Sequence, residues 1–190
     1  MSDTTHLYIK NMVCQRCIMA VSDILQRLGL HAQEISLGTV KLTVPLKQEE
    51  REALRTALQT VGFELIDDKR MQLIEQIRHA VIRLVHQEDC VLNTKLSYYL
   101  QQACHRDYSS LSKLFSDVKG ISIEKYYIAQ RIERAKELLI YDELTLNQIA
   151  DRLHYSSTAH LSAQFKSITG LSPRQFKLNK GAKRLPLDKV

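Results

Sequence analysis

The 190-residue sequence contains no tryptophan, three prolines and six glycines, and no proline- or glycine-rich linker divides it. No apolar run approaches the ~20 residues that a helix needs to cross a bilayer, which argues against a membrane-spanning segment. Residues 1–6 are polar and lack the basic and apolar regions of a secretory signal peptide. We therefore expect a cytoplasmic protein, in which the four cysteines are free thiols or ligands rather than disulfides.

Groupings typical of enzyme active sites are also missing from the sequence. No Ser/His/Asp set, no paired carboxylates and no glycine-rich phosphate loop stand at a recognisable spacing. The sequence therefore argues against an enzyme.

Basic residues are concentrated in the C-terminal part of the chain. Residues 1–67 hold 7 Lys and Arg against 8 Asp and Glu, whereas residues 68–190 hold 20 against 13. The whole net charge of +6 thus arises after residue 67. A basic domain usually has a polyanion such as nucleic acid as its partner, although such charge can also be a solvated face.

The first 67 residues alternate between strand and helix patterns. Four short stretches have strand character and two have apolar residues at helical spacing, with Gly29 and Gly38 as turn signals. We predict strands at 6–10, 32–37, 40–44 and 63–66 and helices at 17–28 and 48–61. This βαββαβ order is that of the ferredoxin-like arrangement.

After the charged border at 67–70 the pattern is helical throughout. The predicted fold class is therefore α+β, with a ferredoxin-like βαββαβ domain over residues 1–67 followed by an all-α double helix-turn-helix domain over residues 68–190. A plain all-α binding bundle is the alternative for the second domain.

The clearest helix-turn-helix unit spans residues 145–168. Thr145 and Gln148 form a capping box, which predicts a helix start at Leu146. A turn follows at 154–156, and Ser156 or Ser157 can cap a second helix. Ala150 is small where the two helices must cross closely, as in units that place a recognition helix in the major groove.

A similar unit is predicted at 94–118, with helices at 96–104 and 109–118 around a turn at 105–108. The apolar stripe at 123–140 predicts one continuous helix between the two units. Its length of about 27 Å is close to the ~34 Å that separates successive major-groove faces. One rigid helix could thus place two recognition helices on one DNA face.

Four segments of the C-terminal part resemble the DNA-binding domain of the AraC/XylS family over about residues 70–178. They are 130–139 (QRIERAKELL), 149–157 (IADRLHYSS), 160–166 (HLSAQFK) and 169–176 (TGLSPRQF). The resemblance implies a transcriptional regulator that binds double-stranded promoter DNA, with RNA polymerase and a second copy in a homodimer as further partners. Both turns carry histidine, His105 and His154, where the family usually has glycine, so a positive φ there would be strained.

The resemblance also implies which side chains contact DNA. They lie on the second helix of each unit: Ser109, Ser110, Ser112 and Lys113 in the first, and Ser157, Thr158, His160, Ser162 and Ala163 in the second. Lys166 and the later basic residues Lys177, Lys180, Lys183 and Arg184 are expected to contact phosphates or to be solvated. Because hydroxyl groups discriminate weakly between bases, shape readout is expected to contribute.

Cys14 and Cys17 lie three residues apart where a loop enters a helix. Thiolates at a helix N-terminus have a lowered pKa and can bind a soft metal such as Cu(I). A redox-active dithiol and a purely structural loop are the alternatives. With the βαββαβ order, this stretch resembles the Met-x-Cys-x-x-Cys heavy-metal-associated domain, which implies Cu(I), Zn or Hg as ligand, Met12 as buried support and Phe63 beside the metal loop.

The remaining thiols and histidines suggest no site. We expect Cys104 in the core, Cys90 in a loop, and His79 and His86 as solvated side chains. The leading hypothesis is a regulator that senses a soft metal through Cys14 and Cys17. Its rivals are a regulator whose first domain only dimerises or binds a partner, and a cytosolic metal carrier.

Overall fold

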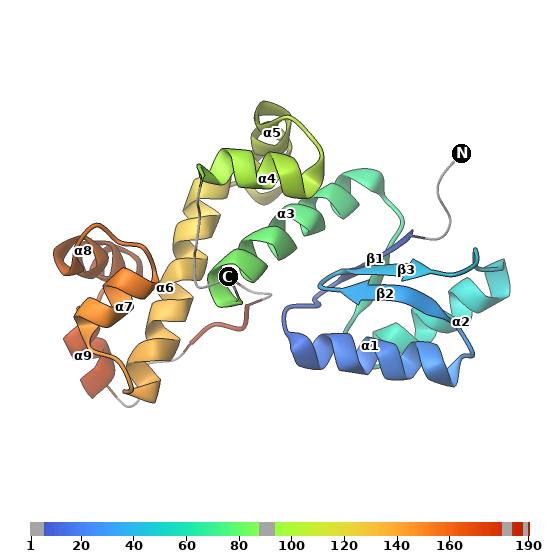
Figure 1. Ribbon diagram of the computed structural model, residues 1–190, viewed down its shortest axis with the longest axis horizontal. Coiled ribbons are helices and arrows are strands. Elements are labelled where there is room, and N and C mark those ends of the chain that lie inside the picture. The colour runs from blue at the N-terminus through green and yellow to red at the C-terminus, as the bar shows by residue number, and fades with distance from the viewer. Residues whose placement is uncertain (1–5, 88–93, 180–183, 188–189) are drawn as a thin grey trace. The chain divides into compact units, whose positions relative to one another are not determined.

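The computed structural model describes residues 6–87, 94–179, 184–187 and 190 (Figure 1). The chain divides into two compact parts, unit 1 with residues 1–79 and unit 2 with residues 80–190. The division falls inside helix α3 (Lys69–His86), twelve residues after the border expected at residue 67. Cys90, which was expected in a loop, lies outside the described residues.

Unit 1 contains a four-stranded sheet and two helices that precede α3. Its strands have the order β2-β3-β1-β4, and every neighbouring pair is antiparallel. Its elements are, in chain order, β1 (His6–Lys10), α1 (Gln15–Arg27), β2 (Ala32–Ser36), β3 (Thr39–Leu42), α2 (Gln48–Gln59) and β4 (Glu64–Ile66). An α+β unit with a small sheet at the N-terminal end is thus confirmed.

The core of unit 1 follows from the strand alternation. Leu7 and Ile9 point to the same side of β1, because successive side chains of a strand face opposite sides. They join one buried cluster with residues from both helices, such as Leu25 of α1 and Leu58 of α2. The apolar faces of the two helices and the apolar side of the sheet therefore pack together in one core.

Gly38 turns the chain between β2 and β3 with a φ of 74°. Its carbonyl accepts a hydrogen bond from the backbone N–H of Ile9 at 2.9 Å. A Cβ atom at this position would lie 1.8 Å from the ring of His79, which packs over the turn from α3. Glycine is needed here both for its backbone conformation and for this close approach.

The expectation that His79 and His86 are solvated is wrong. The side chain of His79 is 7% exposed and that of His86 8% exposed. Residues 74–82 of α3 are buried except for Gln76, so the polar side chains among them are desolvated, and Arg78 pairs with the buried carboxylate of Glu75 at 2.7 Å. Burial lowers the pKa of both histidines to about 4.

Among its described residues, unit 2 contains helices and no strand, as predicted. In Figure 1, α6 (Ile123–Tyr141) runs between a pair of helices near one end and a group of three near the other. The pair is α4 (Leu96–Cys104) and α5 (Tyr108–Lys119), and the group is α7 (Leu146–Arg152), α8 (Thr158–Thr169) and α9 (Pro173–Leu178). Across the described parts of the chain, no helix combines the length and apolar character needed to cross a membrane.

Helix α6 packs against one helix of the pair and against all three helices of the group. Its 19 residues extend over about 29 Å. It contacts α5, α7, α8 and α9, and its buried residues include Ile132, Ala135 and Leu139. The single helix predicted between the two units is therefore present, and it ends one residue later than expected.

Residues 184–187, which we call the C-terminal strap, lie against α6. The backbone N–H of Leu185 donates to the carboxylate of Glu133 at 3.0 Å, and the side-chain amide of Gln130 donates to the carbonyl of Leu187 at 3.3 Å. Arg184 pairs with Glu137 at 3.3 Å. Gln130 and Glu133 are buried, so the strap supplies partners for polar groups that water does not reach.

Candidate nucleic-acid interface and thiol pair

Helix α7 starts with the predicted capping box. The hydroxyl of Thr145 accepts from the backbone N–H of Gln148 at 3.3 Å, and the side chain of Gln148 accepts from the N–H of Thr145 at 2.8 Å. Of the two serines expected to cap α8, Ser157 does so: its hydroxyl accepts from the N–H of His160 at 3.1 Å. Both helix starts of this unit are thus fixed by local side chains.

Helices α7 and α8 pack against each other, and Ala150, the small residue predicted at their crossing, is buried. The turn between them contains His154 at a φ of 52°, after which the N–H of Tyr155 donates to the carbonyl of Ala150 at 2.9 Å. The geometry is that of a short helix followed by a tight turn and a second helix.

The predicted contact residues of α8 lie apart from its buried side. Leu161 and Phe165 are the buried residues of this helix. The residues expected to touch DNA are exposed or half-buried: Ser157, His160, Ala163 and Lys166 are exposed, and Thr158 and Ser162 are half-buried. The helix therefore presents a mostly uncharged polar surface.

His160 is held in place on that surface. Its Nδ1 lies 3.1 Å from the hydroxyl of Ser156, and its ring meets that of Tyr155 edge-on, with centroids 5.3 Å apart. An imidazole fixed in this way loses little side-chain freedom when it binds a partner.

In the first helix-turn-helix unit, made of α4 and α5, helix α5 begins at Tyr108, one residue before the predicted start, because Asp107 caps it. The carboxylate of Asp107 accepts from both the N–H and the hydroxyl of Ser109. The hydroxyl of Ser109 is therefore engaged in the cap, which the sequence reasoning missed although aspartate is a favoured cap residue. Of the other predicted contacts, Ser110 and Lys113 are exposed and Ser112 is half-buried.

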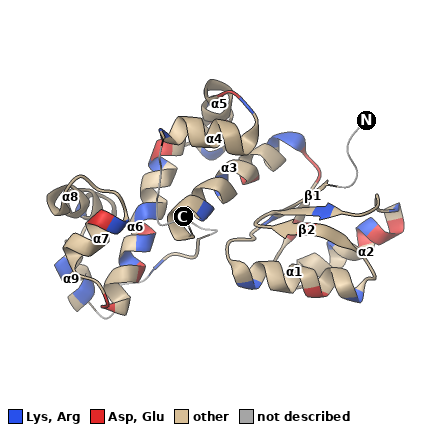
Figure 2. Cartoon of the chain, in the orientation of Figure 1, with Lys and Arg blue, Asp and Glu red and all other residues tan. Residues whose placement is uncertain are grey.

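Positive charge in unit 2 lies mainly outside α8. Figure 2 shows basic residues on α6 and α9, whereas Lys166 is the single lysine or arginine within α8. Lys177 forms an ion pair with Asp142, and Lys180 and Lys183 lie outside the described residues.

Cys14 and Cys17 come together at the start of α1. Cys14 is the N-cap residue and Cys17 lies in the first turn, with 3.5 Å between their Sγ atoms. Burial opposes ionisation of Cys14, but hydrogen bonds from Cys17 and Arg16 and the charge of Arg16 outweigh it and lower its pKa. Burial raises the pKa of Cys17, and the neighbouring Cys14 raises it further. The pair thus contains one activated thiol.

Core packing and a hydrogen bond hold the residues around the thiol pair. Met12 is fully buried, as expected, and Phe63 joins the same core cluster. Asn11 has a φ of 71°, and its side-chain amide donates to the carbonyl of Gly62 at 3.0 Å. Asparagine tolerates this backbone conformation better than most residues. The asparagine before the two cysteines was therefore a sequence signal for a turn at Asn11.

The sulfur spacing can be compared with that of a metal site. Tetrahedral coordination with metal–sulfur bonds of about 2.3 Å places two sulfurs about 3.8 Å apart, close to the 3.5 Å observed. No group of three or more potential ligand side chains occurs within the described ranges. Cys14 and Cys17 therefore offer two soft sulfur donors at a spacing suited to binding one ion together.

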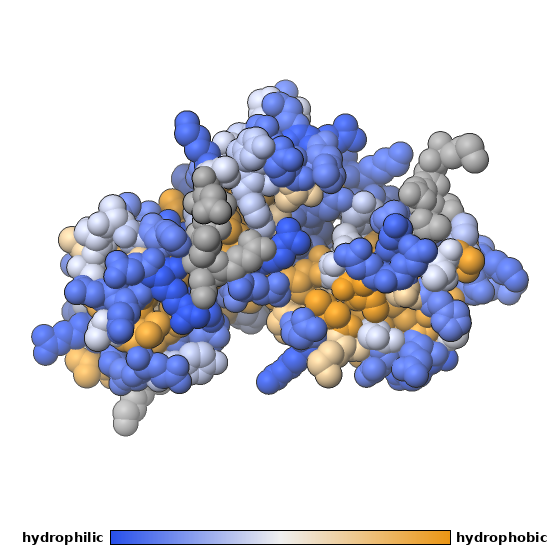
Figure 3. All heavy atoms as spheres, in the orientation of Figure 1, coloured by the Kyte–Doolittle hydropathy of each residue, from blue (hydrophilic) through white to orange (hydrophobic). Residues whose placement is uncertain are grey.

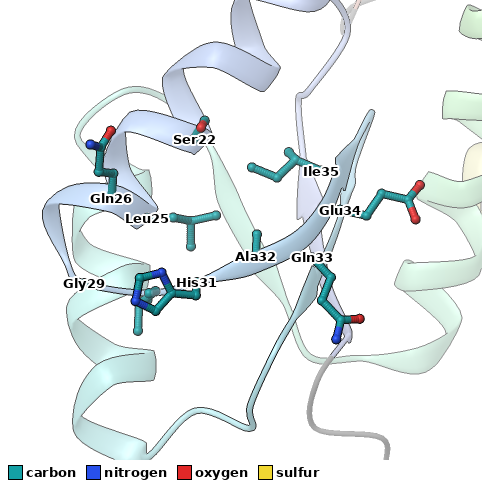
Figure 4. A pocket seen from close by; sticks show the side chains of 10 residues that line it. Ser22, Leu25, Gln26, Gly29, His31, Ala32, Gln33, Glu34 and Ile35 are labelled. Atoms are coloured by element: carbon teal, nitrogen blue, oxygen red, sulfur yellow. The ribbon is translucent and has the colours of Figure 1, made fainter.

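A shallow groove lies elsewhere on unit 1, between α1 and the edge strand β2. It has a volume of about 430 Å³, and its lining includes Leu25, His31 and Ile35 (Figure 4). Figure 3 shows hydrophobic residues gathered where these elements lie. The sequence reasoning did not single out this groove, which contains neither cysteine of the thiol pair.

Residues 100–179 match the family model described as a helix-turn-helix domain. Over 124 aligned residues the chain is 28% identical to an uncharacterized HTH-type transcriptional regulator of Staphylococcus aureus strain MSSA476, covering 56% of this chain and 17% of the relative. It is 24% identical over 107 residues to the uncharacterized HTH-type transcriptional regulator YtdP of Bacillus subtilis strain 168, covering 56% and 14%. The chain therefore spans less than a fifth of the length of these relatives.

Among solved structures, the chain resembles the C-terminal domain of AraT, a response regulator from Geobacillus stearothermophilus. The TM-score is 0.50 at 24% sequence identity, over 60% of this chain and 89% of that one. This likeness concerns the fold. The helix-turn-helix expectation is thereby confirmed for residues 100–179.

Proposed function

We propose that the chain is a sequence-specific DNA-binding transcriptional regulator of the AraC/XylS type. The match of residues 100–179 to the helix-turn-helix domain is the starting point of this proposal. The observation that carries this proposal is the α7–α8 unit. Its two helices pack against each other, Ala150 of α7 is buried, and α8 has an exposed polar surface. Such a helix fits the major groove of double-stranded DNA.

The two kinds of side chain on the proposed interface have different roles. His160, Ser162 and Thr158 offer hydrogen-bonding groups to base edges. Lys113 and Lys166, both exposed, neutralise phosphates and favour binding to any sequence. Since few of these groups discriminate strongly, DNA shape contributes to the choice of site.

The test is gel retardation of a duplex taken from the region upstream of the chain's own gene. We expect retardation at low salt and progressive loss as salt rises. Lys113→Ala should weaken binding to all duplexes, whereas Lys41→Ala, an exposed lysine of unit 1, serves as the charge-matched control. Failure of the wild-type chain to retain any duplex at low salt would refute the proposal.

We further propose that unit 1 has a ferredoxin-like fold of the heavy-metal-associated type and binds Cu(I) through Cys14 and Cys17. The 3.5 Å sulfur spacing, the lowered pKa of Cys14 and the burial of Met12 beneath the loop support this assignment. Metal binding can regulate DNA affinity only if it favours one state of the protein over another. A change in homodimer formation, or in contact with RNA polymerase, could supply that difference.

Metal sensing is tested by measuring DNA affinity with and without Cu(I), in the wild type and in the Cys14→Ser/Cys17→Ser variant. Sensing predicts a metal-dependent change in the wild type that the double variant lacks. Equal affinities in all four measurements would favour the rival in which unit 1 only dimerises. Cu(I) binding by a chain that retains no DNA would instead favour the metal carrier.

A further inference from the structure

Arg131 of α6 contacts the second helix-turn-helix unit rather than solvent alone. Its guanidinium carbon lies 3.7 Å from the centre of the Tyr155 ring, in the turn between α7 and α8. One guanidinium nitrogen donates to the backbone carbonyl of Leu153, at the end of α7. That carbonyl belongs to the last turn of a helix, where a positive charge is favourable.

Tyr155 extends this contact to α8. Its hydroxyl donates to the side chain of Gln164 at 2.6 Å, and its ring meets that of His160 at an angle of 88°. Tyr155 is itself buried. A single ring thus touches the cation on α6 and two side chains one turn apart on α8.

The first helix-turn-helix unit, made of α4 and α5, contacts α6 through other residues. There the hydroxyl of Tyr108, at the start of α5, donates to the carboxylate of Glu124 near the start of α6. A change at Arg131 should therefore disturb one unit and leave the other in place.

We infer that Arg131 is a positioning residue: through Tyr155 it fixes the rotation of α8 relative to α6, and with it the direction in which His160 points. This inference rests on the proposed DNA-binding function. A planar guanidinium can stack on the ring and donate to the carbonyl at the same time, and a lysine ammonium cannot reproduce both contacts.

The experiment compares Arg131→Ala and Arg131→Lys with Lys125→Ala, which removes the same charge from an exposed position of α6. The free full-length chain is examined by NMR, with the side-chain signals of His160 and Gln164 as reporters for α8 and the amide of Lys113 as reporter for α5. We expect both Arg131 variants to shift the α8 signals and to leave Lys113 unchanged. Lys125→Ala should change neither.

DNA binding is then measured on a duplex selected by the wild type from a random pool. Both Arg131 variants should lose about tenfold in affinity, equivalent to about 1.4 kcal/mol. Their footprints should lose protection over the half-site covered by α8 and keep it over the other. Unchanged α8 signals, or wild-type binding by Arg131→Lys, would overturn the inference.

If circular dichroism shows Arg131→Ala to be unfolded, the comparison is made with Arg131→Lys, which keeps the charge. Unchanged α8 signals in that variant overturn the inference. If the wild type selects no duplex, the DNA-binding proposal fails, while the NMR comparison still decides whether Arg131 orients α8.

Discussion

His105 and His154 adopt the same left-handed backbone conformation at equivalent places in the two helix-turn-helix units, with φ angles of 50° and 52°. Each follows the first helix of its unit, and each side chain is exposed. A side chain in this conformation costs about 1–2 kcal/mol relative to glycine. Both turns therefore carry strain that their exposed side chains do nothing to offset through packing.

Replacing either histidine with glycine should stabilise the chain. The relief of strain exceeds the entropy that glycine adds to the unfolded state, so we expect a gain of about 0.5–1 kcal/mol at each site. Urea unfolding followed by circular dichroism measures it. His31→Gly is the control, since His31 is exposed without a positive φ, and it should destabilise slightly. A loss of stability in His105→Gly and His154→Gly would contradict the strain argument.

Enlarging the buried Ala150 should separate α7 from α8. Ala150→Leu is expected to cost about 1–3 kcal/mol of folding free energy, because the larger side chain must be accommodated at a buried position that holds alanine. DNA retardation should weaken in parallel. Asn147→Leu adds similar bulk at an exposed position of the same helix and should change stability by less than about 0.5 kcal/mol. Equal effects of both substitutions would show that the crossing tolerates a large residue.

Alanine substitutions at Gly29 and Gly38 of unit 1 distinguish the cost of backbone strain from the cost of a steric clash. Gly29 and Gly38 both have a positive φ, but only at Gly38 would a Cβ atom meet another residue, the buried His79. Gly29→Ala should cost about 1–2 kcal/mol from strain alone. Gly38→Ala should cost clearly more, because the His79 ring must move. Thermal unfolding of both variants compares them, and similar losses would mean that the ring moves freely.

The three described free thiols should differ in reactivity. The pKa of Cys14 is lowered, whereas burial raises that of Cys104 to about 11. Because the thiolate is the reactive form, iodoacetamide should label Cys14 first and leave Cys104 unlabelled in the folded chain. Mass spectrometry across pH 6–9 follows the order. Arg16→Ala should move the labelling of Cys14 to higher pH, since Arg16 favours its thiolate; labelling of Cys104 at the same rate would refute the assignment.

Stability should fall as the pH drops below about 6.5. The folded pKa of His86 is about 4, lowered by burial, so below pH 6.5 the unfolded chain binds protons that the folded chain does not. The loss builds up as the pH falls toward 4 and reaches about 3 kcal/mol for this group. Gln130 and Glu137 face the ring and favour its charged form, whereas Arg134 and Arg184 oppose it.

His86→Gln separates this contribution from the rest. The variant can still hydrogen-bond Gln130 but does not titrate, so its stability should depend less steeply on pH between 6.5 and 4. Urea unfolding at several pH values gives the two slopes. Identical slopes for wild type and variant would show that His86 is not the group that takes up the proton.

Local patterns in the sequence predicted most elements of the fold. The alternation around Leu7 and Ile9 placed β1, and the pair Thr145 and Gln148 placed the start of α7, because in each case the signal lies within one turn or strand. The burial of His86 could not be found in this way. It depends on Gln130, 44 residues further along the chain, and no local periodicity reports that contact.

The same limit applies to the candidate site. The sequence placed Cys14, Cys17 and the contact residues of α8 on their elements, because each lies inside a recognisable local motif. It did not point to the contact between Arg131 and Tyr155, which meet only once α6 and the α7–α8 turn have packed together.

A fragment that keeps every described contact of unit 2 must include the C-terminal strap. The match to the helix-turn-helix family ends at residue 179, before the strap begins. A chain cut there would leave the amide of Gln130 and the carboxylate of Glu133 without their partners in residues 185–187. Expression of this region for crystallisation or DNA selection should therefore continue at least through Leu187.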